Sequence, residues 1–490
     1  MAVPLIERCK GHAAHIAVVD SAGEHTYGNL AARASAVAAA LLGARTSLDG
    51  ARVAFMTAPG HQYVAALLGV WMAGGMAVPL CRGLPVPEIR HVLQDSGARF
   101  VVADAEHLPH MHAATSRASS LEKMVTAAPW VLPEVAAAHR ALILYTSGTT
   151  SRPKGVVTTH ANIQAMITPL VTAWEWRRQD RILHVLPLHH AHGLVNALLC
   201  CLWAGATCEM LQGFNARAVW ERFGYVTLFM AVPTMYHKLL REWRTSPPAV
   251  RKAWAQAAAG PRLMVSGSAA LPESLLDAWE RVTGQRLLER YGMTEIGMAL
   301  SNPLAGERRR GAVGQPLPGI DVRLVDEEGE TVVAEGASGV LHVRGPGVFR
   351  EYWGQPGTTR EAFHDGWFRT GDVAVVQDGY YRILGREADI IKTGGEKVSA
   401  PEVEAVLHQH PAIDHCAVVG IQDAEWGQRV CAAAVVHPGC SIDPEALRRW
   451  AKARLAGCKV PSRVVFLDAL PQGTTGKVFR PALRRLFQED

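Results

Sequence analysis

The feature that most constrains the fold is a regular alternation of short apolar strands with helical segments along the first half of the chain. Runs typical of buried strands occur at 52–56, 99–104 and 141–144, and amphipathic or apolar helical patterns lie between them at 63–72 and 87–95. Strands that alternate with helices favour parallel sheets covered by crossover helices. The sequence therefore predicts an α/β fold with sheets that are rich in parallel strands.

The same pattern continues and then changes. Further strands are predicted at 182–186, 226–232 and 262–266. After Asn302 the Gly and Pro content rises and short alternating strands follow, which indicates a small β subdomain over about 303–386.

The length also bears on domain organisation, because 490 residues exceed what one hydrophobic core usually supports. A separate, smaller pattern begins after the Gly-rich segment 386–395, with helices at 402–407 and 444–455. We expect a large domain at 1–386 and an α+β C-terminal domain at 387–490.

Composition excludes several classes. Apolar residues make up 49% and charged residues 19%, as in globular chains. The net charge of +5 is spread over the whole length, and no Lys/Arg run reaches five residues, so no nucleic-acid partner is predicted. The chain also lacks an apolar stretch of about 18 residues, so no membrane span is expected.

Cysteine usage and the N-terminus bear on location. The nine cysteines are odd in number and form no Cys-x-x-Cys, which is typical of reduced thiols. The first residues lack a basic and then apolar signal. We expect a cytoplasmic protein, or one of the mitochondrial matrix if a presequence is missing.

A polar loop at 145–155 follows the strand at 141–144, and nine of its eleven residues are Gly, Ser, Thr, Pro or Lys. Free backbone N–H groups and hydroxyls can surround an anion, and Lys154 can add a point charge. The loop is not a Walker loop, because Gly155 and a strand follow Lys154. Taken alone, it is either a phosphate-binding loop or a surface turn.

Other polar groups also lie near predicted strand ends. Glu295 could ligate Mg²⁺, although an isolated Glu is usually a surface residue. Asp372 could hold both ribose hydroxyls or simply form an Asx-turn. Lys477, Lys392 and Lys397 lie near glycines and have reach and charge, but most lysines only aid solubility.

Three histidines, His189, His190 and His192, lie close together in sequence. Their spacing does not favour a metal site, because no carboxylate lies in the segment and the helix of a His-Glu-x-x-His site is absent. A place along an acyl pocket is the better interpretation.

Together these segments resemble the acyl-adenylate-forming superfamily of acyl-CoA synthetases, adenylation domains and luciferases, over essentially the whole chain. The matching segments are, in order, 145–155, 291–295, 367–372, 385–386, 391–395 and 476–477. The resemblance implies an AMP-forming acid–thiol ligase that uses ATP, Mg²⁺ and CoA.

The resemblance also implies a set of site residues. The catalytic group comprises Lys477, Glu295, Thr294 and His190, and the metal-binding group comprises Glu295 and Thr149. The residues expected to bind ATP or CoA are Thr146, Ser147, Gly148, Thr149, Thr150, Lys154, Gly267, Ser268, Ala269, Glu289, Tyr291, Gly292, Met293, Asp372, Arg386, Lys392, Gly394 and Gly395.

At the substrate end the chain is similar to malonyl-CoA synthetases. That resemblance assigns His192, Ser268 and Arg290 to the distal carboxylate of malonate and places Met298 in the same pocket. A guanidinium in an apolar pocket pairs well with a carboxylate and is costly without one. Ala191 stands where related microbial enzymes tend to carry Thr, so methylmalonate is a further candidate substrate.

The chain departs from the family at two positions. Ser151 replaces a frequent Gly in the phosphate loop, and Ala388 replaces the usual polar residue of the hinge, with Asp389 adjacent. The resemblance implies that the C-terminal domain rotates at this hinge, so that Lys477 serves adenylation and the face at 392–397 serves the thiol step.

Three alternatives stay open from the sequence. They are a short- or medium-chain fatty acyl-CoA synthetase, an adenylating enzyme that loads a carrier protein, and a non-catalytic nucleotide-binding protein. The expected partners are a small dicarboxylate, ATP and CoA, and the expected assembly is a monomer or a homodimer.

Overall fold

The structure is a computed structural model that describes residues 3–126, 131–146, 153–326, 332–471 and 478–488. The chain divides into two compact units, Met1–Val322 with Val343–Phe368, and Arg323–His342 with Arg369–Asp490. The expected α/β class, with parallel-rich sheets in the large N-terminal part and a smaller α+β part at the C-terminus, is confirmed. The hinge near Arg386 is a prediction about movement, and it stays one.

The first unit contains a nine-stranded sheet in the order β15-β14-β13-β12-β11-β9-β10-β1-β2. The six strands from β13 to β1 run parallel. At the edges, β2 pairs antiparallel with β1, β14 with β13, and β15 with β14. The strands are β1 (Ile16–Asp20), β2 (Gly23–Thr26), β9 (Arg181–His184), β10 (Thr207–Met210), β11 (Leu228–Ala231), β12 (Leu263–Ser266), β13 (Leu288–Met293), β14 (Gly297–Ser301) and β15 (Gln315–Pro316).

A second, seven-stranded sheet in the same unit has the order β18-β8-β7-β4-β3-β5-β6. The five strands from β7 to β6 run parallel. Strand β8 pairs antiparallel with β7, and β18 pairs antiparallel with β8. The strands are β3 (Arg52–Met56), β4 (Met76–Pro79), β5 (Phe100–Ala103), β6 (Ala118–Ser120), β7 (Arg140–Thr146), β8 (Lys154–Thr159) and β18 (Glu351–Tyr352).

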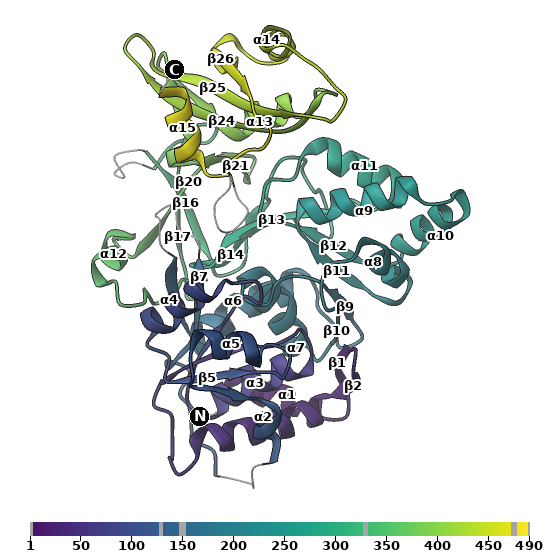
Figure 1. The fold of residues 1–490 in the computed structure, drawn as a ribbon, viewed down its shortest axis with the longest axis vertical. Coiled ribbons are helices and arrows are strands. Elements are labelled where there is room, and N and C mark those ends of the chain that lie inside the picture. The colour runs from purple at the N-terminus through teal and green to yellow at the C-terminus, as the bar shows by residue number, and fades with distance from the viewer. Residues whose placement is uncertain (1–2, 127–130, 147–152, 327–331, 472–477, 489–490) are drawn as a thin grey trace. The chain divides into compact units, whose positions relative to one another are not determined.

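Helices cover both faces of these sheets (Figure 1). They are α1 (Pro4–Lys10), α2 (Tyr27–Leu42), α3 (His61–Met72), α4 (Val86–Ser96), α5 (Leu108–Ala114), α6 (His160–Ala173), α7 (Cys200–Ala204), α8 (Ala216–Arg222), α9 (Pro233–Thr245), α10 (Pro248–Ala258), α11 (Glu273–Thr283) and α12 (Pro356–Glu361). The largest apolar cluster joins α2, α3 and α6 to strands of both sheets. Helix α3 is buried on nearly every side, as a helix packed between two sheets must be.

The opposite face of the nine-stranded sheet has its own core. Alternate strand residues, Leu183, Phe229 and Met264, pack against helices α8 to α11, whereas their neighbours face the central cluster. Successive strand side chains point to opposite faces, so apolar runs without alternation give a sheet that is buried on both sides.

A five-stranded sheet in the order β16-β17-β20-β19, with β21 paired to β20, lies mostly in the second unit. Its strands are β16 (Asp321–Val325), β17 (Ser338–Arg344), β19 (Phe363–His364), β20 (Trp367–Gln377) and β21 (Tyr380–Arg386). These are the short strands that the Gly- and Pro-rich texture after Asn302 predicted.

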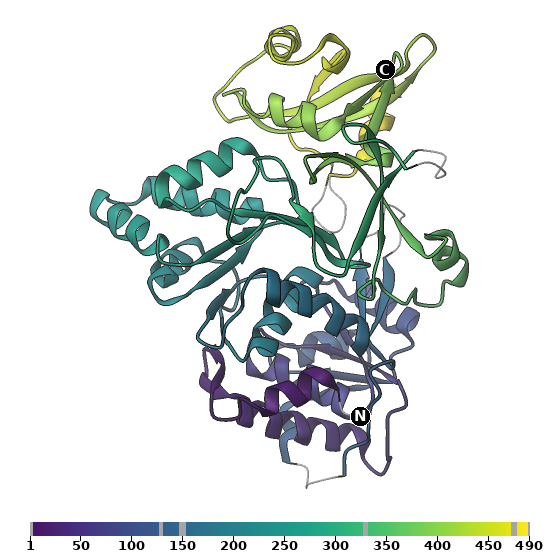
Figure 2. The ribbon, with the colours of Figure 1, turned by 180° about the vertical axis from the view of Figure 1, so that it is seen from behind.

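The C-terminal sheet has the order β23-β22-β25-β24, with β26 beside β25. Figure 2 shows the light-green and yellow strands and helices of this part of the chain from behind. Its strands are β22 (Ile390–Thr393), β23 (Glu396–Ser399), β24 (Ile413–Asp423), β25 (Gly427–Val436) and β26 (Arg463–Phe466), and its helices are α13 (Ala400–Leu407), α14 (Pro444–Lys452) and α15 (Arg480–Gln488). Val418 packs with α13 and α14, whereas Ala417 and Val419 pack with α15, so these helices cover opposite faces.

Local signals in the sequence succeeded and failed in informative places. Thr26 caps α2, because its side chain accepts a hydrogen bond from Asn29 N at 3.1 Å. The segment 386–395, which has the texture of a polar loop, instead contains β22. No helix within the described ranges is long and apolar enough to cross a membrane.

Candidate active site

The first site feature is the side chain of Arg290, which β13 carries into the interior of the first unit. Arg290 is 5% exposed. Its Nε and Nη2 atoms have no hydrogen-bond partner among the residues that the structure describes. Burial lowers the pKa of Arg290 to about 9, so the guanidinium still carries its charge at neutral pH. A buried charge in this state is costly unless an anion joins it.

The backbone that follows β12 makes room for this guanidinium. A Cβ atom on Gly267 would lie 2.4 Å from Cζ of Arg290, so only glycine fits without displacing the arginine. The next residue, Ser268, has a φ of +67°, which is uncommon for a residue with a side chain. Backbone strain of this kind concentrates at binding sites.

Ser268 connects the arginine to the histidine cluster. Its Oγ atom lies 3.1 Å from Nδ1 of His192, whereas Nε2 of His192 is buried and unpartnered among the described residues. Burial and then the charge of Arg290 hold the pKa of His192 well below its usual value. His192 is therefore a neutral imidazole that can still donate one hydrogen bond. The structure thus brings together the three residues predicted to hold a carboxylate.

An unusual helix positions His192. The segment His192–Leu199 is a π-helix, which sequence periodicity did not predict. Such helices occur mostly as short bulges at functional sites. Gly193 allows the tight entry, because a Cβ there would lie 2.4 Å from the Pro187 carbonyl oxygen. The carbonyl oxygen of Gly193 in turn accepts a hydrogen bond from His184 Nε2 at 2.9 Å.

Sequence reasoning missed two polar residues on these elements. Asn196 lies four residues after His192 in the π-helix, and its Oδ1 is buried without a partner in the described part of the chain. Ser266 ends β12, and its Oγ is in the same state. The only sequence signal was the occurrence of polar residues within otherwise apolar segments.

A second group of predicted residues surrounds Glu295, in the turn between β13 and β14. Glu295 is buried, and its Oε1 accepts a hydrogen bond from the Tyr352 hydroxyl at 3.0 Å. Lys154 Nζ lies 5.2 Å from the centre of the Tyr352 ring. Tyr352, another residue that sequence reasoning did not single out, therefore connects the predicted metal ligand to the predicted phosphate-binding lysine.

The start of the polar loop is also described. Thr146 Oγ1 donates to the Lys154 carbonyl at 3.5 Å across the β7–β8 pair. Tyr145 donates to Asp95 Oδ2 at 2.6 Å, which fixes the strand before the loop. The remaining loop residues with predicted roles, and the predicted catalytic lysine, lie outside the described residues; they are Ser147, Gly148, Thr149, Thr150 and Lys477.

Other predicted residues of the first unit lie on the same strands as Arg290 or next to them. Met298 on β14 is buried and pairs with Gly292 on β13. Glu289 is buried beside Arg290, and Ala269 is exposed next to Ser268. The residues Tyr291, Met293 and Thr294 are half-buried at the end of β13, and His190 is exposed with its ring 4.1 Å from that of His189.

The second unit holds the predicted ribose-binding pair. Asp372 on β20 is buried, and Arg386 on β21 forms an ion pair with it at 2.8 Å between Nε and Oδ1. Arg386 Nη1 also donates to the Thr370 carbonyl at 3.0 Å. The two predicted residues are therefore adjacent on paired strands, with their positions fixed by hydrogen bonds.

The predicted thiol-step residues form the β22–β23 hairpin. Lys392 is exposed, and its backbone N–H donates to Gln428 Oε1 at 2.9 Å. Gly394 and Gly395 have φ values of +57° and +84° and make the turn. A Cβ on Gly394 would lie 2.8 Å from the ring of Trp426, so glycine is needed both for conformation and for space.

Comparison with known proteins gives the class. The AMP-binding enzyme family matches residues 5–353, and the C-terminal domain of AMP-binding enzymes matches residues 402–477. The chain belongs to the AMP-binding enzyme family, and the predicted membership of the acyl-adenylate-forming superfamily is confirmed.

Particular relatives narrow this class. The chain is 44% identical to the mitochondrial malonate–CoA ligase of Homo sapiens, over 99% of this chain and 92% of that protein. It is 38% identical to a malonate–CoA ligase of Arabidopsis thaliana, over 90% and 79% of the two chains. The ATP-bound crystal structure of MatB from Rhodopseudomonas palustris matches with a TM-score of 0.90 and 33% identity, over 100% of this chain and 99% of that one.

The cost of the unpaired guanidinium predicts an unusual effect on stability. We expect Arg290→Met to raise the free energy of unfolding of the ligand-free protein by roughly 1–4 kcal/mol, because an apolar side chain replaces a buried charge without a partner. Thermal unfolding in the absence of acid and nucleotide measures this.

A matched variant gives the opposite sign. Arg262 Nε donates to Asp180 Oδ1 at 2.9 Å, and Asp180 is buried. Arg262→Met should therefore lower the free energy of unfolding by roughly 3–5 kcal/mol, because the buried Asp180 loses its paired cation and keeps the hydrogen bonds from Thr227 Oγ1 and the Arg177 backbone N–H. If both variants destabilise the protein alike, Arg290 is not an uncompensated charge.

Proposed function

We propose that the chain is a malonate–CoA ligase, which converts malonate, ATP and CoA to malonyl-CoA, AMP and pyrophosphate. The observation that carries the proposal is the buried Arg290 guanidinium, whose Nε and Nη2 have no hydrogen-bond partner among the residues that the structure describes. A monocarboxylic acid of the fatty class would give no anion to this group. A dicarboxylate supplies one carboxylate to Arg290 and keeps the other for reaction.

The three pocket residues differ in what they contribute. Arg290 offers the positive charge and two N–H donors in a planar fork that matches a carboxylate. His192, neutral and buried, adds a directional hydrogen bond without a second charge. Ser268 holds the His192 ring through its Oγ and offers a hydroxyl beside the same pocket.

In the first step, an oxygen of the free carboxylate attacks the α-phosphorus of ATP, and pyrophosphate leaves to give a malonyl-adenylate. Little proton transfer is needed, so positioning and charge stabilisation supply most of the rate. Thr146, Lys154 and the loop between them are proposed to hold the β- and γ-phosphates. Asp372 and Arg386 are proposed to hold the ribose.

Glu295 is the proposed Mg²⁺ ligand. Its carboxylate is buried, and the Tyr352 hydroxyl donates to Oε1 and orients it; carboxylate oxygens are ligands that Mg²⁺ prefers. Mg²⁺ would supply charge neutralisation at the phosphate oxygens. Thr149 is proposed as a further ligand, and Thr294 as a contact to the α-phosphate.

In the second step, the CoA thiolate attacks the acyl carbonyl carbon, and the bond to AMP breaks to give malonyl-CoA. We assign Lys392, Gly394 and Gly395 to the path of the pantetheine arm. Gly395 has no atom within 4 Å of the position of its absent Cβ, so a thin ligand can approach the backbone closely at this residue. A rotation of the C-terminal domain at residues 386–389 is proposed to exchange Lys477 for this hairpin.

We propose that this reaction takes place in a reducing compartment, either the cytoplasm or the mitochondrial matrix, because all nine cysteines carry free thiols. The human relative is mitochondrial by its name.

The role of Arg290 predicts a substrate-dependent loss. Arg290→Leu should lower kcat/KM for malonate by about 10²–10³-fold, the effect of deleting one partner of a buried charge pair. Activity on butyrate should be unchanged or higher, because the pocket becomes apolar. AMP release with CoA present, measured over a panel of mono- and dicarboxylates, tests this.

A control and two other outcomes complete the design. Arg310→Leu removes an exposed arginine that pairs with Asp277 and should leave both activities unchanged. If Arg290→Leu leaves the preferred substrate unharmed, the protein is a fatty acyl-CoA synthetase of the same fold. AMP release that requires a holo-carrier protein in place of CoA would instead indicate a carrier-loading enzyme.

Methylmalonate is a second proposed substrate, because Ala191 gives a small side chain at the entrance to the π-helix. Ala191→Thr should lower turnover of methylmalonate several-fold more than turnover of malonate, since the larger side chain occupies the space for the α-methyl group. Comparing the two acids on both proteins measures this, and the absence of methylmalonate turnover in the unmodified protein would contradict it.

Lys477 is proposed to act only in the first step. Lys477→Ala should abolish pyrophosphate release yet leave thioester formation from supplied malonyl-adenylate largely intact, because the amine stabilises charge only during adenylation. Lys392→Ala is the matched variant and should show the reverse pattern. Equal losses in both steps for Lys477→Ala would remove this assignment.

A further inference from the structure

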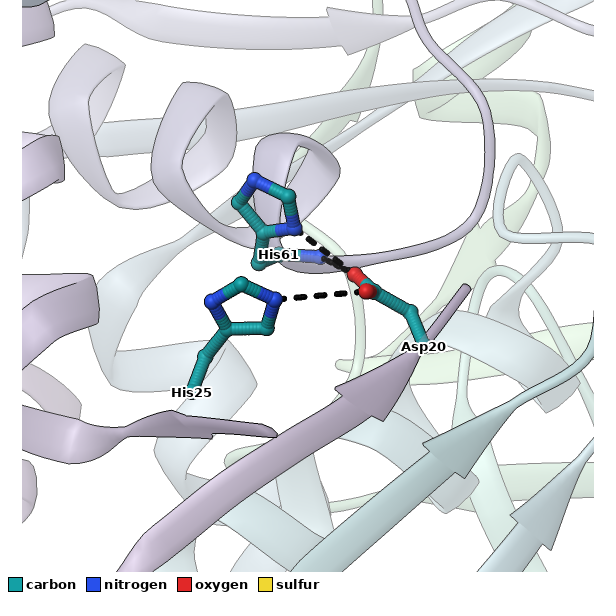
Figure 3. Close-up of side chains that lie close together, drawn as sticks. All are labelled: Asp20, His25 and His61. Atoms are coloured by element: carbon teal, nitrogen blue, oxygen red, sulfur yellow. Dashed lines mark hydrogen bonds and ion pairs between the residues drawn. The ribbon is translucent and has the colours of Figure 1, made fainter. Parts of the chain in front are cut away.

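A cluster of one carboxylate and two imidazoles lies away from every residue assigned above. Asp20 ends β1, His25 lies on the antiparallel neighbour β2, and His61 is the first residue of α3. Figure 3 shows the two rings directed at the Asp20 carboxylate from two different elements. These three residues form no motif in the sequence, because 41 positions separate Asp20 from His61.

The distances within this cluster are short. His25 Nε2 lies 3.2 Å from Asp20 Oδ1, and His61 Nδ1 lies 2.7 Å from Asp20 Oδ2. The two rings are stacked with centroids 3.9 Å apart. One ligand atom from each of the three residues lies within 4.8 Å of the other two, and no other group of three or more His, Cys, Asp or Glu in the described chain meets this condition.

The surrounding backbone holds the carboxylate in place. Asp20 accepts hydrogen bonds from the backbone N–H groups of Ala22 and His61, both at 2.8 Å. Gly60 has a φ of +154°, and a Cβ there would lie 2.6 Å from Asp20 Oδ2. The approach of α3 to the carboxylate therefore depends on a glycine at this position.

The donor atoms of the cluster suit a cation, because a carboxylate oxygen and two imidazole nitrogens are side-chain ligands that divalent metal ions take.

We propose that Asp20, His25 and His61 form a binding site for one Zn²⁺ ion, with water at the fourth position. Two nitrogens and one carboxylate oxygen are common zinc ligands. Bond lengths near 2.0 Å place tetrahedral ligands about 3.3 Å apart. His25 Nε2 lies 3.2 Å from Asp20 Oδ1 and His61 Nδ1 lies 2.7 Å from Asp20 Oδ2, so each imidazole nitrogen is close to that spacing from one oxygen of the carboxylate. Among metals that such ligands take, Zn²⁺ binds more tightly than Mn²⁺ or Fe²⁺.

The site joins two elements that sequence alone leaves independent. Zn²⁺ would fasten the β1–β2 hairpin to the start of α3. Two residues further along α3, the Tyr63 hydroxyl donates to the Leu188 carbonyl at 2.7 Å, just before the histidines of the acyl pocket. The proposed ion therefore fixes the start of the helix that contacts this segment through Tyr63.

Zinc binding to the full-length protein tests the proposal. Metal-free protein is titrated with Zn²⁺ in competition with a chromogenic chelator, and with Co²⁺ followed by its visible absorption. We expect the unmodified protein to bind one Zn²⁺ ion per chain tightly at this site. His25→Asn and His61→Asn should each weaken Zn²⁺ binding at this site by at least about 100-fold. Co²⁺ should show the intense bands of tetrahedral coordination in the unmodified protein and lose them in His25→Asn and His61→Asn.

The controls separate a metal site from a hydrogen-bonded cluster. The backbone N–H groups that donate to the Asp20 carboxylate belong to Ala22 and His61, so His25→Asn leaves these two hydrogen bonds intact. His25→Cys should retain the site and add a thiolate-to-Co²⁺ band. His107→Asn removes an imidazole that lies 2.6 Å from Asp104 Oδ1 and 3.9 Å from Glu106 Oε1, in a group whose ligand atoms do not all lie within 4.8 Å of one another, and should not change Zn²⁺ binding. Equal zinc stoichiometry and affinity in the unmodified protein, His25→Asn and His61→Asn would overturn the proposal.

Discussion

The arrangement of the acyl pocket depends on one buried charge. Arg290 enters an apolar interior on β13, and the described chain offers no partner for its Nε and Nη2 atoms. Folding must supply the free energy of removing this guanidinium from water, and the two large sheets with their shared core are the source. The buried charge therefore lowers the free energy of unfolding of the ligand-free protein. An anion that binds beside the guanidinium would restore part of that free energy.

Several features of the surrounding backbone follow from the same charge. Gly267 has to lack a side chain because the guanidinium lies against it, and Ser268 adopts a left-handed conformation that orients its hydroxyl towards His192. The π-helix after Ala191 places His192 in the interior, where burial and the arginine keep it neutral. Each of these conformations costs free energy by itself, and together they place the three residues that are proposed to bind a carboxylate by charge, geometry and hydrogen bonding.

The sequence predicted the features that are local in character. Apolar runs located β3, β5 and β12, Thr26 located the start of α2, and the order of the motifs identified the family. Long-range packing accounts for the rest. Nothing near Gly267 in sequence indicates that Arg290, 23 positions later, occupies the space of its side chain. The strand β22 was missed because its polar and glycine-rich residues have the composition of a loop, and pairing with β23 overrides that local preference.

The two polar clusters of the first unit show how the same residue types serve different ends. Within the described chain, Arg290 Nε and Nη2 and His192 Nε2 are buried without hydrogen-bond partners, and the proposed specificity for an anion rests on that deficit. Asp20 instead accepts hydrogen bonds from two backbone N–H groups, and both imidazoles lie at hydrogen-bond distance from the same carboxylate. A ligand there has to compete with existing bonds, which an organic acid cannot do, since it would meet a carboxylate of the same charge. A divalent cation can displace the hydrogen bonds between the two imidazoles and the carboxylate, because it forms metal–ligand bonds to the same three side chains.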